Sequence, residues 1–171
     1  MTDTAFALPP LNLEPKPFIC KPIPIKPDWI DYNGHLNMAY YHVIFDLSVD
    51  QLFAMLGLGP NYLRQRNCST MTAECHVRYI REVGPGDPVH VVAWLLETDD
   101  KRLHTFEELR HSTDGWLAAT SENMSLHIDM SKRKVGPFPS DIRERLRQVV
   151  AAQANGPQPE GIGRRIAMPG K

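Results

Sequence analysis

Apolar side chains between residues 38 and 56 recur at intervals of three and four positions, which is the spacing of one face of an α-helix. The apolar face is so broad that polar residues are confined to one narrow stripe. A helix of this kind has to be covered by a sheet or by a neighbouring subunit. Asn37 and Gly57 are residue types that commonly begin and end helices, so the sequence predicts one long buried helix over 38–56.

After this helix the period of the pattern changes to two, which is typical of β-strands. Residues that favour turns, mainly Gly, Pro and Asp, divide the region into four predicted strands. These strands lie at about 70–79, 88–97, 101–112 and 116–130. Because short turns can join only antiparallel neighbours, the four strands are expected to form an antiparallel sheet.

The alternation also predicts which strand residues face the core. On the first and last of the four strands these are Met71, Ala73, Cys75, Met124, Leu126 and Ile128. Residues 18–27 are extended and rich in proline, which permits a strand only at the edge of a sheet. Ser140 is expected to cap a closing amphipathic helix.

Together these elements predict an α+β fold over residues 18–153. A curved antiparallel sheet of about five to six strands would wrap around one long central helix, with a C-terminal helix after it. Residues 1–17 and 154–171 are rich in Pro, Gly and charge, so they are predicted to be flexible tails. The sheet would leave an edge and an outer face to cover, and subunits of this kind usually pair.

Composition narrows the possible partners. The length of 171 residues fits one domain. The formal net charge of -1 provides no general attraction to nucleic acid or to an anionic membrane, and neither is expected as a partner. The three cysteines lack the spacing of a zinc site or of a disulfide framework. The sequence shows neither a signal peptide nor a long apolar run, so we predict a cytoplasmic protein without metal or cofactor.

The segment Asp31-Tyr32-Asn33-Gly34-His35-Leu36-Asn37 lies where the predicted helix begins. Unpaired N–H groups and the positive end of the helix dipole meet there, and both stabilise an anion or a developing oxyanion. A tight turn at Asn33-Gly34 would bring the Asp31 carboxylate toward the same point. Asp, Asn-Gly and Asn are also ordinary turn and cap residues, although a cap has no need of His35.

The pattern Asp-x-x-Gly-His-x-Asn followed by an aromatic-rich helix resembles the signature of the 4-hydroxybenzoyl-CoA thioesterase group within the hotdog superfamily. The runs at 72–78, 99–104, 118–122 and 126–129 are similar to the thioesterases of carnitine breakdown, which act on betainyl-CoA. Relatives often carry Thr and His at two positions where this chain departs from the pattern, which are Cys75 and Glu107.

This resemblance implies a hotdog fold and hydrolysis of an acyl-CoA thioester to free acid and coenzyme A. It implies homodimers, which can pair further into dimers of dimers. It also implies that Asp31 is catalytic and that the backbone amide of Met38 polarises the thioester carbonyl, while His35 and Asn37 orient and cap the segment. Two routes stay open for Asp31, since its carboxylate could attack the carbonyl directly or orient a water molecule.

Two further groups are candidates for binding substrate. Glu74 and His76 share a strand face, and Glu74 with an aromatic wall could hold a cationic acyl group. The residues considered for that wall are Trp29, Tyr32 and Tyr40. Basic side chains near strand ends could bind the phosphates of coenzyme A, and these are Lys101, Arg102 and Arg81. The alternative is a solvated outer face or a subunit contact in the first case and solubilising charges in the second.

Two other functions remain in competition with hydrolysis. The first is a hotdog enoyl-CoA hydratase or dehydratase, which would use His35 as its acid and base. The second is a non-catalytic acyl-CoA-binding module. Hydration of an enoyl-CoA would identify the first, and tight binding without release of free thiol would identify the second.

Overall fold

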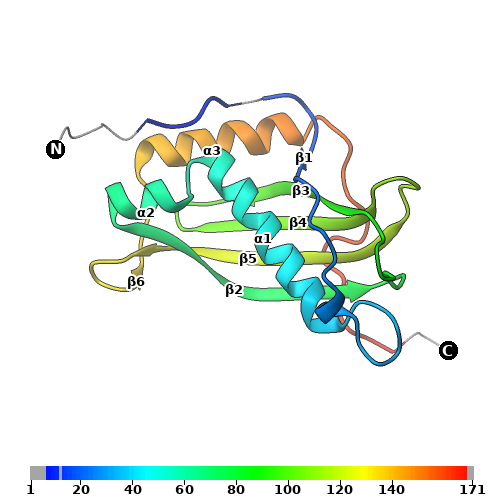
Figure 1. Ribbon diagram of the computed structural model, residues 1–171. Coiled ribbons are helices and arrows are strands. Elements are labelled where there is room, and N and C mark those ends of the chain that lie inside the picture. Colours follow the sequence, from blue (N-terminus) through cyan, green and yellow to red (C-terminus); the bar gives the residue numbers. More distant parts are fainter. Residues whose placement is uncertain (1–6, 12, 169–171) are drawn as a thin grey trace.

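The computed structural model describes residues 7–11 and 13–168. A short 3-10 helix, Pro27–Trp29, lies before the first long helix. The other elements are β1 (Phe18–Ile19), α1 (Met38–Leu56), α2 (Pro60–Arg66), β2 (Cys68–Tyr79), β3 (Val89–Thr98), β4 (Arg102–His111), β5 (Leu117–Asp129), β6 (Lys134–Val135) and α3 (Ser140–Gln153). The strands form one antiparallel sheet in the order β1-β3-β4-β5-β2, with β6 paired to β5 (Figure 1). The predicted sheet, central helix and C-terminal helix are therefore confirmed.

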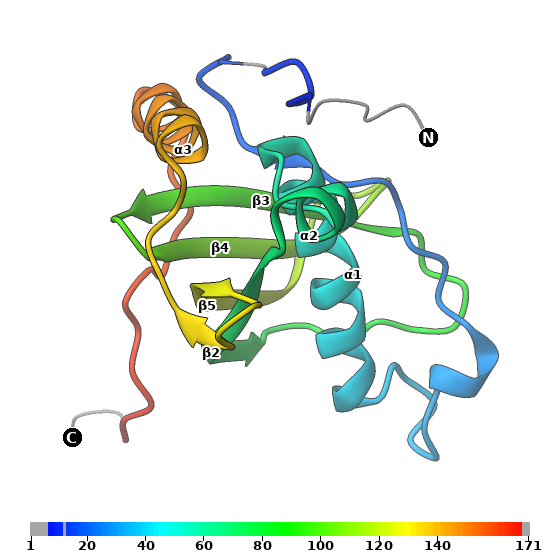
Figure 2. The ribbon, with the colours of Figure 1, turned by 90° about the vertical axis from the view of Figure 1, so that its left-hand side faces the viewer.

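α1 has the predicted bounds because both of its ends are capped as expected. The Asn37 side chain accepts a hydrogen bond from the Ala39 N–H at 2.9 Å. Gly57 ends the helix with a φ of 86°, a left-handed conformation that glycine adopts at little cost. The helix crosses one face of the sheet, and the C-terminal segment lies on the other side (Figures 1 and 2).

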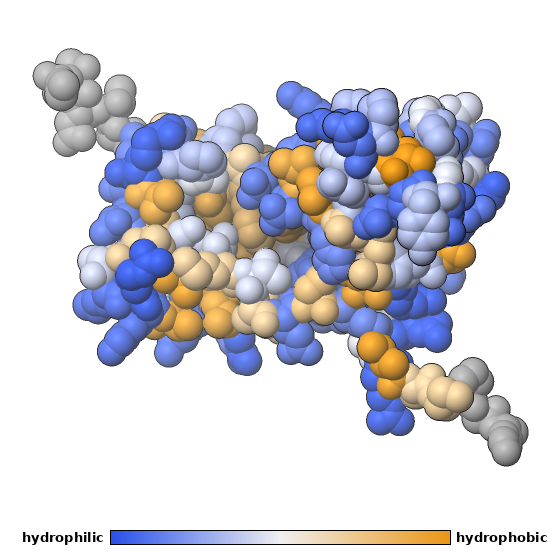
Figure 3. Space-filling model, turned by 60° about the horizontal axis from the view of Figure 1, so that its bottom comes forward, coloured by the Kyte–Doolittle hydropathy of each residue, from blue (hydrophilic) through white to orange (hydrophobic). Residues whose placement is uncertain are grey.

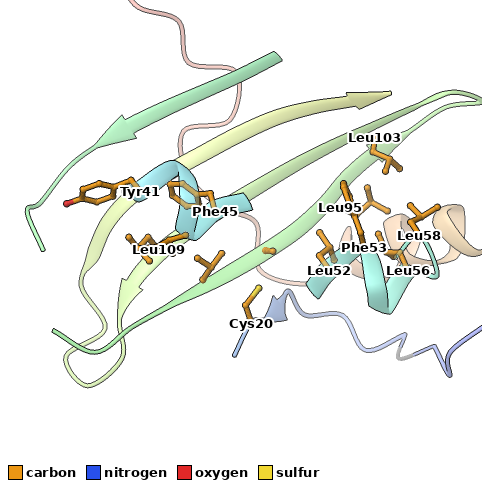
Figure 4. Close-up of a cluster of buried hydrophobic side chains, with 14 of the residues drawn as sticks. Cys20, Tyr41, Phe45, Leu52, Phe53, Leu56, Leu58, Leu95, Leu103 and Leu109 are labelled. Carbon is orange, nitrogen blue, oxygen red and sulfur yellow. The ribbon is translucent and has the colours of Figure 1, made fainter. Parts of the chain in front are cut away.

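The core lies between α1 and the strands. Leu52 and Leu56 of α1 are fully buried, and Leu95 and Leu103 of β3 and β4 are buried with them (Figure 4). α3 packs against β3 and adds apolar side chains to the same cluster, chiefly Ile142, Leu146 and Val149. Ser140 is the first residue of α3 and not its cap, contrary to expectation. The cap position belongs to Pro139, which makes no side-chain hydrogen bond.

The predicted alternation of β2 is wrong in its first half. A β-bulge between Thr72 and Glu74 leaves Ala73 without a partner on β5. One extra residue exchanges the two faces of a strand. Thr72 therefore faces α1 before the bulge and Cys75 faces it afterwards, whereas Met71 points away and is 45% exposed.

β5 presents to α1 the face that the sequence analysis assigned to the outside. Ser121, Asn123 and Ser125 point toward α1 and are buried. Met124 and Leu126, which were expected in the core, are only partly buried on the opposite face. The reason is that β5 faces a cavity beneath α1, which it lines with polar side chains, so apolarity does not identify the inward row there.

The two edges of the sheet differ. At the β3 edge, β1 pairs with β3, and the Leu95 N–H beyond it donates to the Gln153 side chain of α3 at 2.9 Å. At the other edge β2 pairs with β5 on its inner side and with no described strand on its outer side, and residues 71–75 are exposed. An uncovered strand edge offers unpaired backbone groups to another chain.

The described parts of both end segments contact the domain. Gln153 donates a hydrogen bond to the Lys16 carbonyl at 3.2 Å. On the face away from α1, the Trp94 indole donates to the Pro157 carbonyl at 3.0 Å, and the Gly163 N–H donates to Glu122 at 2.8 Å. Flexibility of residues 1–17 and 154–171 stays a prediction. Within the described residues, no single helix is both long enough and apolar enough to cross a membrane. Only α1 and α2 taken together reach that length and apolarity, and they are bent by 55° relative to each other.

Tyr62→Phe should destabilise the fold by about 1–3 kcal/mol, because it leaves a buried acceptor unpaired. The Tyr62 hydroxyl lies 2.7 Å from His127 Nε2, and His127 Nδ1 lies 2.9 Å from the Gly136 carbonyl. Burial lowers the pKa of His127, so the ring is neutral and accepts from Tyr62. Chemical denaturation measures the effect. Tyr32→Phe is the control, since Tyr32 is 97% exposed; equal stability of both variants would contradict the prediction.

Candidate active site

The segment before α1 is a tight turn held by its own backbone. The Asp31 N–H donates to the His35 carbonyl at 3.0 Å, and the Gly34 N–H donates to the Asp31 carbonyl at 3.0 Å. Gly34 has a φ of 84°, which requires a residue that tolerates the left-handed region. Ile30 and Leu36 pair across the turn as an isolated bridge. Asp31 therefore has a defined position beside the start of the helix.

Backbone contacts attach this turn to the rest of the domain. Leu36 is buried, and its N–H donates to the Val83 carbonyl at 2.8 Å. The Asn37 N–H donates to the Trp29 carbonyl at 2.9 Å. These bonds place the N-terminal start of α1 next to the segment between β2 and β3.

The Asp31 carboxylate uses only one of its oxygens within the chain. Oδ1 accepts a hydrogen bond from the Asn33 N–H at 2.8 Å. Oδ2 has no hydrogen-bond partner among the residues that the structure describes. The carboxylate is partly exposed. It is therefore oriented by the turn and has one oxygen available for a substrate or a water molecule.

A backbone donor is also available at the start of α1. The first N–H groups of a helix have no partner inside it. Here Asn37 takes up two of them, because its side chain accepts from Ala39 and its carbonyl accepts from Tyr40 at 2.9 Å. The Met38 N–H has no partner among the described residues. It is the donor that a developing oxyanion could use.

His35 is held next to the turn. Its Nδ1 lies 3.3 Å from the Leu36 carbonyl, and its Nε2 lies 3.9 Å from the Glu82 carboxylate. These contacts fit the orienting role that was expected for His35. Asn37 is confirmed as the cap of the helix.

The predicted substrate-binding residues do not converge within one chain. Glu74 and His76 border a hollow with Glu122 and His104, on the face of the sheet away from α1. Trp29 and Tyr40 stack on each other at 5.1 Å beside the start of α1, and Tyr32 is almost fully exposed. The expected pairing of Glu74 with an aromatic wall is therefore absent from this arrangement of the described residues.

The three basic residues that were predicted to bind the phosphates of coenzyme A also lie apart from one another. The Arg81 guanidinium lies 4.1 Å from the centre of the Trp116 ring, and both residues border a polar hollow with Asn33, Gly34 and His35. Arg102 forms an ion pair with Asp99 at 2.6 Å. Lys101 and Arg102 lie at the turn between β3 and β4, at the opposite end of the sheet. Only Arg81 is close to the Asp31 turn in the same chain.

A cavity that the hydrophobic pattern did not predict lies between α1 and the sheet. It has a volume of about 360 Å³ and opens beside β2, on the side brought forward in Figure 3. Residues that line it include His42, Phe45, Asp46, Cys75, Glu107 and Asn123. The signal for it was the polar row Ser121, Asn123 and Ser125, which a strand with an apolar inner face would not contain.

Known proteins resemble this chain in sequence and in fold. A family model described as the thioesterase-like superfamily matches residues 25–146. The chain belongs to this superfamily. A betainyl-CoA thioesterase from Pseudomonas aeruginosa is 37% identical over 146 residues, which cover 85% of this chain and 92% of the relative. A bifunctional L-carnitine dehydrogenase/betainyl-CoA thioesterase from Rhizobium meliloti is 31% identical over 138 residues, 81% of this chain but 28% of the relative.

Solved structures show the same architecture. A Staphylococcus aureus protein in complex with CoA aligns with a TM-score of 0.79 at 29% identity, covering 90% of this chain and 98% of the other. A Pseudomonas putida protein aligns with a TM-score of 0.77 at 33% identity, with the same coverage. The predicted hotdog fold and the predicted reaction class, hydrolysis of acyl-CoA thioesters, are confirmed.

Asp31→Asn should lower kcat by about 10⁴-fold, which is the decrease that removal of a catalytic carboxylate typically causes. The amide can still accept from the Asn33 N–H, so the turn and the melting temperature should be unchanged. Release of free thiol from an acyl-CoA measures kcat. The matched control is Asp28→Asn, because Asp28 is an exposed carboxylate three residues away. Equal activity of the two variants would exclude a catalytic role for Asp31.

Proposed function

We propose that this protein hydrolyses betainyl-CoA or a similar small acyl-CoA, with Asp31 and the Met38 amide as its catalytic groups. The observation that carries the proposal is a turn that leaves one carboxylate oxygen of Asp31 unpaired and leads directly into the unpaired N–H at the start of α1. The substrate class is supported by the relative from P. aeruginosa, which the chain matches over nearly its whole length.

In this reaction the thioester carbonyl oxygen would lie against the Met38 N–H, which stabilises the negative charge that develops during attack. The free oxygen of Asp31 would then attack the carbonyl carbon or align a water molecule to do so. Its other oxygen, bonded to Asn33, keeps the group in place at no cost during the reaction. The leaving group is the thiolate of coenzyme A. On the direct route this leaves an acyl anhydride on Asp31, and water then hydrolyses it to the free acid and the regenerated carboxylate. His35 and Asn37 position the turn and the helix end.

The phosphates of coenzyme A require cations, and Arg81 is the predicted cation that lies beside the turn. Its guanidinium is already held over Trp116, which limits the freedom it would lose on binding. Lys101 and Arg102 can contribute to the same site only from another subunit, since they lie at the far end of the sheet.

A homodimer formed through the β2 edge accounts for the asymmetry of the sheet. The β3 edge is covered by β1 and Gln153, whereas β2 is open. Met71 of β2 is 45% exposed at this open edge. Pairing of two β2 strands would extend the sheet across both subunits and bury its apolar side chain. Further pairing into dimers of dimers is part of the same proposal.

A thiol-release assay tests the reaction and its substrate class together. Betainyl-CoA should be hydrolysed with a higher kcat/KM than acetyl-, hydroxybenzoyl- and medium-chain acyl-CoAs. An enoyl-CoA should lose its thioester and should not be hydrated. Binding without thiol release, or hydration of the enoyl-CoA, would contradict the proposed reaction. Preference for another acyl-CoA would contradict only the substrate.

Met71→Asp/Ala73→Asp should convert the dimer to monomers, because the new carboxylates meet Glu74 and their own symmetry copies at the paired edge. Leu63→Asp/Val135→Asp is the control, since it adds the same charge at apolar positions of similar exposure on α2 and β6. Analytical ultracentrifugation gives the mass of each variant. A dimer that survives the edge substitutions, or a control that dissociates equally, would exclude the β2 interface.

A further inference from the structure

The cavity beneath α1 contains a carboxyl group that the protein leaves incompletely paired. Glu107 lies on β4 and is 1% exposed. Its Oε2 accepts a hydrogen bond from the Asn123 side chain at 3.0 Å. Its Oε1 is buried and has no partner among the described residues. A buried carboxyl oxygen without a partner costs folding free energy, so the cavity is organised for something other than stability.

The charges that line this cavity have one sign. Glu107 lies inside and Asp46 lies at the exposed side of α1, while no Lys or Arg lines the space. Phe45 contributes an aromatic wall. An anionic or purely apolar ligand would offer no opposite charge to Asp46 and no partner to the buried Oε1 of Glu107. A cation would be attracted by both carboxylates and by the face of the ring.

The ionisation of Glu107 depends on what fills the cavity. Burial raises the pKa of Glu107 well above its usual range, the Asn123 hydrogen bond opposes this, and the negative charge of Asp46 adds to it. The uncharged acid is therefore favoured while no cation is near. A cation against Oε1 would favour the carboxylate, as an opposite charge does for a buried acid.

The cavity begins about one helical turn from the proposed catalytic amide. His42, Phe45, Asp46 and Val49 line it from α1, and they follow Met38 in the spacing of one face of a helix. His42 lies one turn beyond Met38, which is about 6 Å along the helix axis. An acyl group whose carbonyl lay at Met38 would therefore have this cavity one turn away, with Glu107 in its lining.

We propose that this cavity binds the head of the acyl group and that Glu107 selects a compact quaternary ammonium there. This inference rests on the proposed thioesterase function and names the residue that determines its specificity. It differs from the expectation for Glu74, which lies on the opposite face of the sheet. Glu107 acts on binding of the acyl head and takes no part in breaking the thioester bond.

The test uses two acyl-CoAs of the same shape. Betainyl-CoA carries a trimethylammonium group, and 3,3-dimethylbutyryl-CoA carries a neutral tert-butyl group in its place. The wild-type protein should prefer betainyl-CoA. Glu107→Gln keeps the size of the side chain and an oxygen for Asn123, and it should lower kcat/KM for betainyl-CoA by about 100-fold, as loss of one partner in a buried charge pair does. The value for the neutral substrate should stay within about threefold.

Three further variants make the result specific. Glu97→Gln removes an exposed carboxylate and should leave kcat/KM for both substrates unchanged. Asp46 lies at an exposed helix position that tolerates substitution. Asp46→Asn should lower kcat/KM for betainyl-CoA alone, by a smaller factor than Glu107→Gln does. Glu74→Gln tests the competing position. Circular dichroism and thermal melting establish that each variant is folded.

Several outcomes would overturn the inference. One is a wild-type protein that hydrolyses the two substrates equally well. Another is a Glu107→Gln variant that loses both activities in parallel or loses neither. A third is a change of preference in Glu74→Gln and not in Glu107→Gln. In each of these cases thiol is still released by the wild-type protein, so the inference fails while the thioesterase function stands. Absence of thiol release from every acyl-CoA would contradict the function itself.

Discussion

The burial of α1 across one face of the sheet is the constraint on which the rest of this molecule depends. The second half of the helix is fixed by a dry core around Leu52 and Leu56. Its first residue is fixed by the backbone bonds from Leu36 to Val83 and from Asn37 to Trp29. With both ends determined, the open N–H of Met38 and the Asp31 turn have defined positions before any ligand arrives, which lowers the cost of organising a reaction there.

The sequence analysis was most accurate where structure is determined locally. The bounds of α1 follow from Asn37 and Gly57, and the turn before it follows from Asn33-Gly34, because caps and turns depend on neighbouring residues. It was wrong about Met71, Met124 and Leu126, because apolar alternation identifies the inner face only where that face is dry. The bulge at Ala73 has no signal in the alternation, and the cavity makes the inner row of β5 polar.

The distant contacts show a second limit of sequence reasoning. Glu74 and Trp29 both suit a cation site by residue type, yet the sheet separates them onto different faces. Glu107 is brought to Asn123 only by the pairing of β4 with β5. Which residues share a pocket depends on strand register and on the face that each strand presents, and neither is encoded in residue type.

The polar cavity also explains how the fold divides stability and specificity. The buried polar groups of the cavity contribute little to folding, so the apolar cluster, which runs along α1 from Tyr41 and Phe45 to Leu56, has to supply most of the burial. The bulge in β2 lies at the boundary of these roles, since Thr72 and Cys75 on either side of it line the cavity from the open edge of the sheet. In the proposed dimer the partner strand would hold that edge in place. Assembly would then determine the shape of the acyl pocket, because one strand forms both the interface and the wall.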